Sequence, residues 1–256
     1  MAADSLILCY HAVSDEWPER FAVSTGQLGE QVEYLLGRGY RPATFAEAVA
    51  GTVPRALAVT FDDAFRSVPE RALPVLSDLG VPATVFVPTS LVGGPLHIGY
   101  ERWLDTPHRD ELVAASWDQL ASLIEAGWEI ASHTRSHPYL TRLDDESLHR
   151  ELSESRAELQ DRLGRPCGTL AYPYADVDAR VVDAARSAGY AAAATIFGCF
   201  HAARDPLRQP RVVVYRHNTL ARFRLKARPR LHALMASRPI RAIRAPFSAP
   251  SGRARR

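Results

Sequence analysis

The stretch Ser132-His133-Thr134-Arg135-Ser136-His137 follows a short apolar run, residues 128–131, which is typical of a buried strand. His133 and His137 lie four positions apart just beyond that strand, so both imidazoles can bend toward one point. Imidazole is the commonest protein ligand for transition metals near neutral pH. The pair therefore indicates a metal site, with two hydrogen-bonded or exposed histidines as the alternative.

A second polar signal, Thr60-Phe61-Asp62-Asp63, also lies at the end of an apolar run. Adjacent carboxylates raise each other's pKa, so we expect a nearby cation to hold them ionised. One aspartate and two histidines supply three ligands and leave open positions. That pattern is typical of a catalytic metal rather than a structural one.

Strands and helices alternate along the chain. Apolar runs predict seven strands, at residues 6–10, 57–61, 83–87, 128–131, 169–172, 191–196 and 212–215. Glycine is expected to end the helices between them, at Gly39, Gly80, Gly127, Gly164 and Gly189. The alternation predicts parallel βα units in a (β/α) barrel of somewhat fewer than eight units, with a doubly wound open sheet as the alternative.

Polar or unusual residues follow four of these predicted strands. They are His11, Asp62-Asp63, the stretch from His133 to His137, and Pro173-Tyr174. In barrels of this type the chemistry takes place at the carboxyl ends of the strands. We therefore expect these residues to share one site.

The composition is that of an ordinary globular protein, with 46% hydrophobic and 23% charged residues. Three widely spaced cysteines, Cys9, Cys167 and Cys199, indicate neither a zinc knuckle nor a disulfide framework. No apolar run approaches the roughly 18 residues of a membrane span. Because no signal-peptide pattern opens the sequence either, we expect a cytoplasmic protein.

Residues 222–256 differ in charge from the rest of the chain. They contain eleven Lys or Arg and no acidic residue, whereas residues 1–221 contain 20 basic and 29 acidic residues. We therefore expect one barrel domain over residues 1–221 and a basic tail over residues 222–256. The tail is interpreted either as peripheral to an anionic membrane surface or as a disordered end. Nucleic-acid binding is not expected, because no recognised motif accompanies the charge.

Three motifs together resemble those of the polysaccharide deacetylases, also called NodB-homology or carbohydrate esterase family 4 proteins. They are Thr60-Phe61-Asp62-Asp63, the stretch from Ser132 to His137, and Ala171-Tyr172-Pro173-Tyr174, and the likeness covers roughly residues 5–216. The resemblance implies a single-domain distorted (β/α)7 barrel. It also implies a hydrolase that removes acetyl from an N-acetylated amino sugar or glycan with a divalent metal, which we expect to be zinc.

The resemblance also implies a role for each matching residue. Asp63, His133 and His137 correspond to the metal ligands, and Asp62 to the general base that takes a proton from the metal-activated water. Tyr174 corresponds to the residue whose backbone N–H stabilises the oxyanion.

The chain departs from the family pattern in two places. Many members have Arg where Ala171 stands, and a late Leu-x-His that supplies the general acid, which is missing here. Tyr10-His11 on the first strand is similar to the exopolysaccharide N-deacetylase branch, and implies that His11 is the proton donor. The alternative is a buried histidine satisfied by a backbone carbonyl. Arg211 is the candidate partner that holds Asp62 ionised, with a surface arginine as the alternative.

Other functions remain open at the level of sequence. The same metal site would serve another amide or an O-acetyl ester, and a degenerate member would bind glycans without catalysis. Tyr100, Trp103 and Tyr139 either stack on a sugar ring or pack locally. If the protein is cytoplasmic, a small or lipid-linked glycoside is the expected substrate.

Overall fold

A computed structural model describes residues 5–196 and 205–228 of the chain. Within these residues, seven parallel strands close into a barrel, because β1 pairs with both β5 and β10. The barrel strands are β1 (Leu6–Tyr10), β5 (Ala56–Phe61), β6 (Ala83–Val87), β7 (Glu129–Ser132), β8 (Thr169–Ala171), β9 (Ala192–Ile196) and β10 (Gln209–Val213). The expected (β/α)7 barrel is confirmed, and the open sheet is excluded because the pairing closes on itself.

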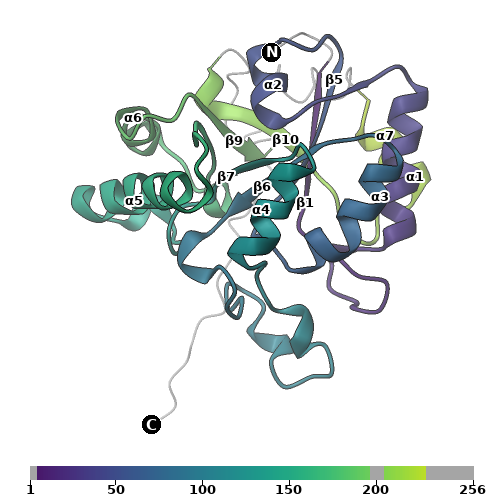
Figure 1. Cartoon of the computed structure of the whole chain (residues 1–256), viewed down its shortest axis with the longest axis horizontal. Coiled ribbons are helices and arrows are strands. Elements are labelled where there is room, and N and C mark those ends of the chain that lie inside the picture. The colour runs from purple at the N-terminus through teal and green to yellow at the C-terminus, as the bar shows by residue number, and fades with distance from the viewer. Residues whose placement is uncertain (1–4, 197–204, 229–256) are drawn as a thin grey trace, which may run out of the picture.

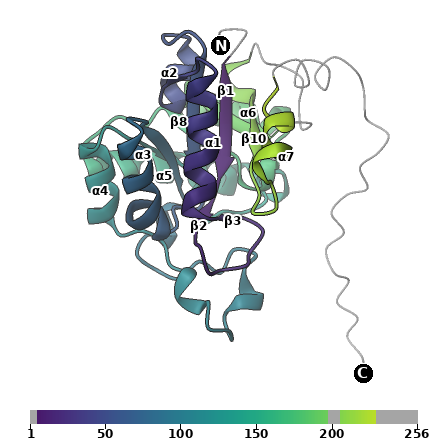
Figure 2. The same ribbon diagram turned by 90° about the vertical axis from the view of Figure 1, so that its right-hand side faces the viewer.

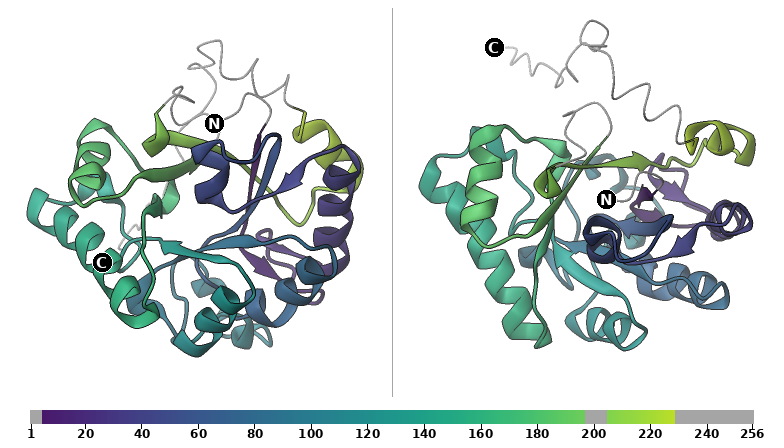
Figure 3. Two further views of the ribbon diagram at one scale, coloured as in Figure 1. Left: turned by 45° about the horizontal axis from the view of Figure 1, so that its top comes forward. Right: turned by 90° about the horizontal axis from the view of Figure 1, so that it is seen from above.

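Most of the helices lie around the outside of the strands, whereas residues 45–50 form a short helix at the amino end of the barrel (Figure 1, Figure 3). The helices are α1 (Thr25–Gly37), α2 (Phe45–Ala50), α3 (Leu73–Asp78), α4 (Trp117–Glu125), α5 (Asp145–Leu163), α6 (Ala179–Ser187) and α7 (Leu220–Lys226). Three short strands complete the regular structure: β4 (Arg41–Pro42) extends the sheet beside β5, and β2 (Ala12–Val13) pairs with β3 (Ala22–Val23).

Local sequence signals fix where several of these helices begin and end. The side chains of four N-cap residues each accept a hydrogen bond from the backbone N–H three residues on, namely Ser24, Thr44, Ser116 and Asp144. Left-handed glycines then end α2 and α5, with φ of 74° at Gly51 and 64° at Gly164. Each βα unit is thus delimited by its own residues.

Small side chains fill much of the barrel interior. Because side chains alternate along a strand, Ala56 and Ala58 of β5 point to the opposite face from Leu57 and Val59. The first pair belongs to a buried cluster with Phe45, Phe86, Ala131, Ala171 and Ala194, whereas the second packs in the layer beneath the outer helices. The alanines leave room inside the barrel for one large polar side chain, Arg211.

Two predicted elements differ from the observed ones, and proline explains both. The strand predicted at residues 212–215 is β10, which already begins at Gln209. The strand can include Pro210 because β10 pairs only with β9 at that position, so proline's missing N–H is tolerated there. The helix predicted to end at Gly80 is divided into a π-helical turn, Val68–Ala72, and α3. Pro74 cannot donate a backbone hydrogen bond to the preceding turn, so the regular α-helical ladder is interrupted there.

The predicted start of the basic tail lies inside α7, so the packed part of the chain continues past residue 222. Helix α7 lies beside α1 (Figure 2). Phe223 is buried, and the guanidinium of Arg224 lies 4.8 Å from the ring centroid of Tyr34 on α1. Residues 229–256 of the predicted tail lie outside the described residues. None of the helices in the described ranges is long and apolar enough to cross a membrane.

Candidate active site

The residues singled out in the sequence gather at the carboxyl ends of the barrel strands. In chain order these residues are His11 after β1, Asp62 and Asp63 after β5, His133 and His137 after β7, Tyr174 after β8 and Arg211 within β10. The structure brings them into contact in two adjoining groups, one around Asp63 and one around Asp62. This is the single shared site that the strand ends predicted.

The side chains of Asp63, His133 and His137 form a compact, buried group whose ligand atoms could hold a metal ion. Asp63 Oδ1 lies 3.5 Å from Nε2 of His133 and 3.3 Å from Nε2 of His137. Ligands at about 2.0–2.2 Å from a tetrahedral ion are roughly 3.3–3.6 Å apart, so this spacing fits a small divalent cation. Asp63 Oδ1 is buried and has no hydrogen-bond partner in the described part of the chain, which is costly for a carboxylate without a cation.

A backbone carbonyl orients His133. Its Nδ1 lies 2.8 Å from the carbonyl oxygen of Ala171, which can only accept, so Nδ1 carries the proton and Nε2 keeps its lone pair for a ligand. Burial lowers the pKa of His133 to about 4. The ring is therefore neutral at pH 7, which is the form that binds a metal.

Glu151 of α5 fixes the turn that carries His137 back toward His133. Its Oε2 accepts hydrogen bonds from the backbone N–H groups of Arg135 at 2.9 Å and Ser136 at 2.8 Å. Its Oε1 accepts the hydroxyl of Ser136 at 2.6 Å. No pattern in the sequence distinguishes Glu151 from the other acidic residues of this charged helix, so sequence reasoning missed it.

Left-handed backbone is concentrated around the site. Residues other than glycine adopt a positive φ rarely and at a cost in free energy. Six residues of the site loops do so: Asp63 (67°), Ala64 (52°), Thr134 (66°), His137 (62°), Tyr174 (57°) and Ala175 (53°). Because the surrounding packing has to hold these conformations, the directions of the ligand side chains are set by the fold rather than by local preference.

Asp62 forms a two-point ion pair with Arg211. Nη1 of Arg211 donates to Oδ1 at 2.6 Å and Nη2 donates to Oδ2 at 2.7 Å. The guanidinium also lies 5.1 Å from the ring centroid of Phe86. Burial alone would raise the pKa of Asp62, but the positive charge of Arg211 holds that pKa far below its usual value. Asp62 is therefore an ionised carboxylate at neutral pH.

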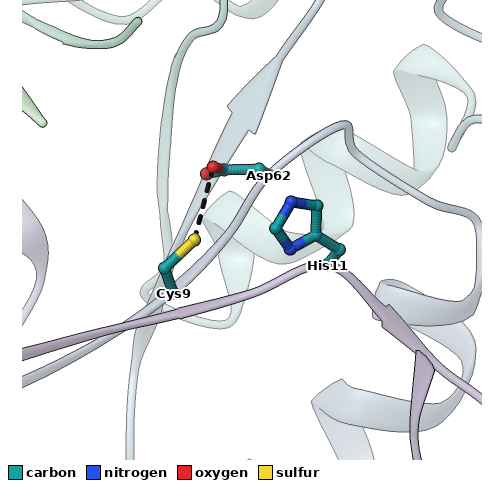
Figure 4. A group of neighbouring side chains, drawn as sticks. All are labelled: Cys9, His11 and Asp62. Atoms are coloured by element: carbon teal, nitrogen blue, oxygen red, sulfur yellow. Dashed lines mark hydrogen bonds between the residues drawn. The ribbon is translucent and has the colours of Figure 1, made fainter. Parts of the chain in front are cut away.

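Cys9 and His11 also lie next to Asp62 (Figure 4). The Cys9 thiol donates to Asp62 Oδ2 at 3.4 Å, and the His11 ring lies 4.4 Å from the ring of Phe21. Nδ1 of His11 is buried without a hydrogen-bond partner among the described residues, so no backbone carbonyl satisfies that nitrogen. Burial lowers the pKa of His11, while the charges of the two aspartates oppose that shift.

Tyr174 lies between Tyr139, on which its ring stacks, and His137, whose ring it meets edge to face. Its ring lies 4.5 Å from the His137 ring and stacks on Tyr139 at 4.1 Å, with 11° between the two planes. The guanidinium of Arg142 lies 4.3 Å from the centroid of the Tyr139 ring. Tyr139 is therefore packed against its neighbours, although 41% of it is exposed.

Two aromatic residues of the segment between β6 and α4 also pack locally. The hydroxyl of Tyr100 donates to Asp63 Oδ2 at 3.2 Å, and the indole N–H of Trp103 donates to Glu19 at 2.8 Å. Both rings lie 5.9 Å from the ring of Trp17. Tyr100 thus contacts a carboxylate of the candidate metal site, and this contact spans 37 residues and leaves no signal in the sequence.

Related proteins carry the same fold. One of the solved structures that match the chain is IcaB from Ammonifex degensii, at a TM-score of 0.71 and 22% identity over 88% of this chain and 97% of the other. Another is the deacetylase PplD of Streptococcus pyogenes in complex with acetate, at a TM-score of 0.73 and 19% identity over 88% of this chain and 98% of the other. At these identities the likeness establishes the fold.

Curated relatives match over shorter segments. A poly-beta-1,6-N-acetyl-D-glucosamine N-deacetylase of Escherichia coli K12 is 33% identical over 151 residues, which are 52% of this chain and 21% of that protein. An enzyme of the same name from Staphylococcus aureus is 24% identical over 64% of this chain and 58% of its own length. The chain thus matches between about a fifth and three fifths of these relatives. The model of one protein family, polysaccharide deacetylase, matches residues 50–193. Because that match covers more than half of the sequence, the chain belongs to the polysaccharide deacetylase family.

Proposed function

We propose that the chain is a metal-dependent N-deacetylase that removes acetyl from an N-acetylated amino sugar of a glycan. The observation that carries the proposal is the pairing of Asp62 with Arg211, directly beside the ligand group of Asp63, His133 and His137. A carboxylate that is ionised at neutral pH and lies next to a cation site is the arrangement that amide hydrolysis by an activated water requires.

The metal would be held by Asp63, His133 and His137. We propose Zn²⁺, because two imidazoles and one carboxylate are a donor set typical of catalytic zinc and leave positions open for other ligands. When bound, such an ion polarises the acetyl carbonyl and makes a water molecule more acidic.

The remaining residues of the site have distinct proposed roles. Asp62 accepts the proton of the attacking water, and Arg211 keeps that carboxylate ionised until it does so. His11 donates a proton to the departing amine nitrogen. The backbone N–H of Tyr174 donates to the oxygen that becomes negatively charged during attack, a type of contact worth roughly 3 kcal/mol.

The names of the relatives suggest which substrate to test first. Both curated relatives are named as deacetylases of poly-beta-1,6-N-acetyl-D-glucosamine. Because the chain matches only part of each, its own substrate is a proposal. We propose a glycan that contains N-acetylglucosamine, and short β-1,6-linked oligomers are the first compounds to assay.

Acetate release by reloaded protein tests the proposal. The chain is stripped with a chelator, reloaded with one equivalent of Zn²⁺ per chain, and assayed in parallel on N-acetylated and O-acetylated sugars. We expect acetate from the N-acetylated oligomers only after reloading. Faster release from the O-acetylated sugars would identify an esterase instead. No release from either class by fully loaded protein would favour a non-catalytic glycan-binding role.

A further inference from the structure

A second group of metal-ligating side chains adjoins the first. One ligand atom each from Cys9, His11 and Asp62 lies within 4.8 Å of the others, and the three side chains face one another across a small space (Figure 4). None of these three residues belongs to the group of Asp63, His133 and His137. The barrel end therefore presents two candidate cation sites, connected by the adjacent residues Asp62 and Asp63.

The donors of the second group differ in kind from those of the first. A thiol sulfur, an imidazole and a carboxylate together favour thiophilic divalent cations such as Cd²⁺ or Zn²⁺ over Mg²⁺ or Ca²⁺. Two observations indicate that the group can accept a ligand. Nδ1 of His11 is buried and unpaired within the described ranges, and the thiol of Cys9 already points at Asp62 Oδ2 from 3.4 Å.

We propose that Cys9, His11 and Asp62 form a second, inhibitory site for a thiophilic divalent cation. On binding, the S–H bond of Cys9 breaks, its proton leaves to solvent, and the sulfur forms a bond to the cation. When the site is occupied, a carboxylate oxygen of Asp62 and a ring nitrogen of His11 are bound to the cation. Asp62 then cannot accept the proton of the water, and His11 cannot donate a proton to the amine. This inhibitory consequence rests on the proposed N-deacetylase function, whereas the binding itself does not.

Three features make the second site weaker than the first. Burial raises the pKa of the Cys9 thiol, so the cation has to displace a tightly held proton. The positive charge of Arg211 is already paired with the carboxylate of Asp62. A cation held by Asp63 would add a second positive charge close by. The second site therefore fills only when the cation is in excess over the chain.

Titration with Cd²⁺ tests binding directly, because cadmium–thiolate bonds give a charge-transfer absorption in the ultraviolet. The wild-type chain is expected to bind two equivalents, with the thiolate absorption growing only during the second. Cys9→Ala should keep the first equivalent and lose the second together with its absorption. Cys167→Ala and Cys199→Ala are matched controls, and both should behave as wild type. Absorption that persists in Cys9→Ala, or that disappears in either control, would overturn the proposal.

A further variant separates a three-ligand site from a lone thiol. His11→Ala should weaken the second equivalent by at least about tenfold without changing the first. Unchanged affinity for the second equivalent would mean that the imidazole takes no part, and would also overturn the site. Retention of the first equivalent in each variant shows that the barrel end is still folded.

Inhibition is measured as acetate release against added Cd²⁺, relative to each variant's own rate with one equivalent of Zn²⁺. In the wild-type chain, activity should fall as the thiolate absorption rises, whereas Cys9→Ala should resist the same concentrations. Full activity with the second site occupied would contradict the inhibitory role. A wild-type chain that releases no acetate even before Cd²⁺ is added contradicts the N-deacetylase proposal instead, and the binding results still stand.

Discussion

Arg211 on β10 donates hydrogen bonds to both carboxylate oxygens of Asp62, at 2.6 and 2.7 Å, although Asp62 lies 149 positions earlier in the chain. Both side chains are buried, so neither charge is solvated by water to any large extent. In such a setting each charge depends on the other, and removing one leaves the other buried and unpaired. Ala171, where an arginine is often found in this family, is part of the small-residue interior that leaves room for this pairing.

Replacing Arg211 is expected to affect stability and pH dependence together. Arg211→Met should lower the free energy of unfolding by about 3–5 kcal/mol, because the Asp62 carboxylate loses its buried counter-ion. Without the guanidinium the pKa of Asp62 rises, so the base is protonated at higher pH and the acidic limb of kcat/KM moves upward. Arg211→Lys keeps the charge but not the two-point contact. Its free energy of unfolding and the pH of its acidic limb should lie between those of the wild type and Arg211→Met. An unchanged acidic limb in Arg211→Met would contradict the pairing as the cause of ionisation.

Asp62→Asn should separate catalysis from metal binding. The change removes the proposed base while leaving Asp63, His133 and His137 in place, so one equivalent of Zn²⁺ should still bind with nearly the wild-type Kd. Acetate release should fall by about 10²–10⁴-fold, the range for loss of a general base. Metal content and kcat measured on the same preparation check both halves. Turnover at the wild-type rate would refute the role of Asp62.

Glu151→Gln is expected to weaken metal binding although Glu151 is not itself a ligand. Its carboxylate holds the turn between His133 and His137 through Arg135 and Ser136, and supporting residues of this kind typically change metal affinity by about 10–100-fold. Glu154→Gln is a matched control, since Glu154 pairs with the half-exposed side chain of Arg135, at 3.2 Å, and not with the backbone of the turn. Competition with a chelating dye gives both Kd values. Equal losses in the two variants would point to helix charge rather than to the turn.

The metal-free protein should lose stability as the pH falls from about 6.5 to about 4. An unfolded histidine titrates near pH 6.5, whereas burial lowers the pKa of His133 to about 4. Between these values the unfolded state binds more protons, so the free energy of unfolding decreases with falling pH. His11, whose pKa burial also lowers, acts in the same direction.

Urea unfolding at pH 7, 6 and 5 measures this dependence. One such group contributes a slope of at most about 1.4 kcal/mol per pH unit. His133→Gln should show a shallower slope than the wild-type chain, because glutamine does not titrate. Parallel slopes in the two proteins would mean that His133 is not the group responsible.

Much of the fold and part of the site can be predicted from the sequence, because they depend on residues that are close together along the chain. The caps at Ser24, Thr44 and Ser116 act over three positions, and a helix begins directly after each of them. The motifs around Asp63 and His133 lie at the ends of strands that the apolar runs locate to within one residue. Predictions from local spacing fail at Pro74 and Pro210, where the observed elements differ from the predicted ones.

The sequence by itself determined the alternation of strands and helices and the presence of two ligand-bearing strand ends, because both follow from short-range spacing. Only the tertiary structure decided which distant groups meet: Arg211 with Asp62, Cys9 with Asp62, and Tyr100 with Asp63. The physical reason is the strand period of two. A shift of β10 by one residue would turn Arg211 out of the barrel and Val212 into it, and the register that prevents this is fixed only when β10 pairs with β1 and β9.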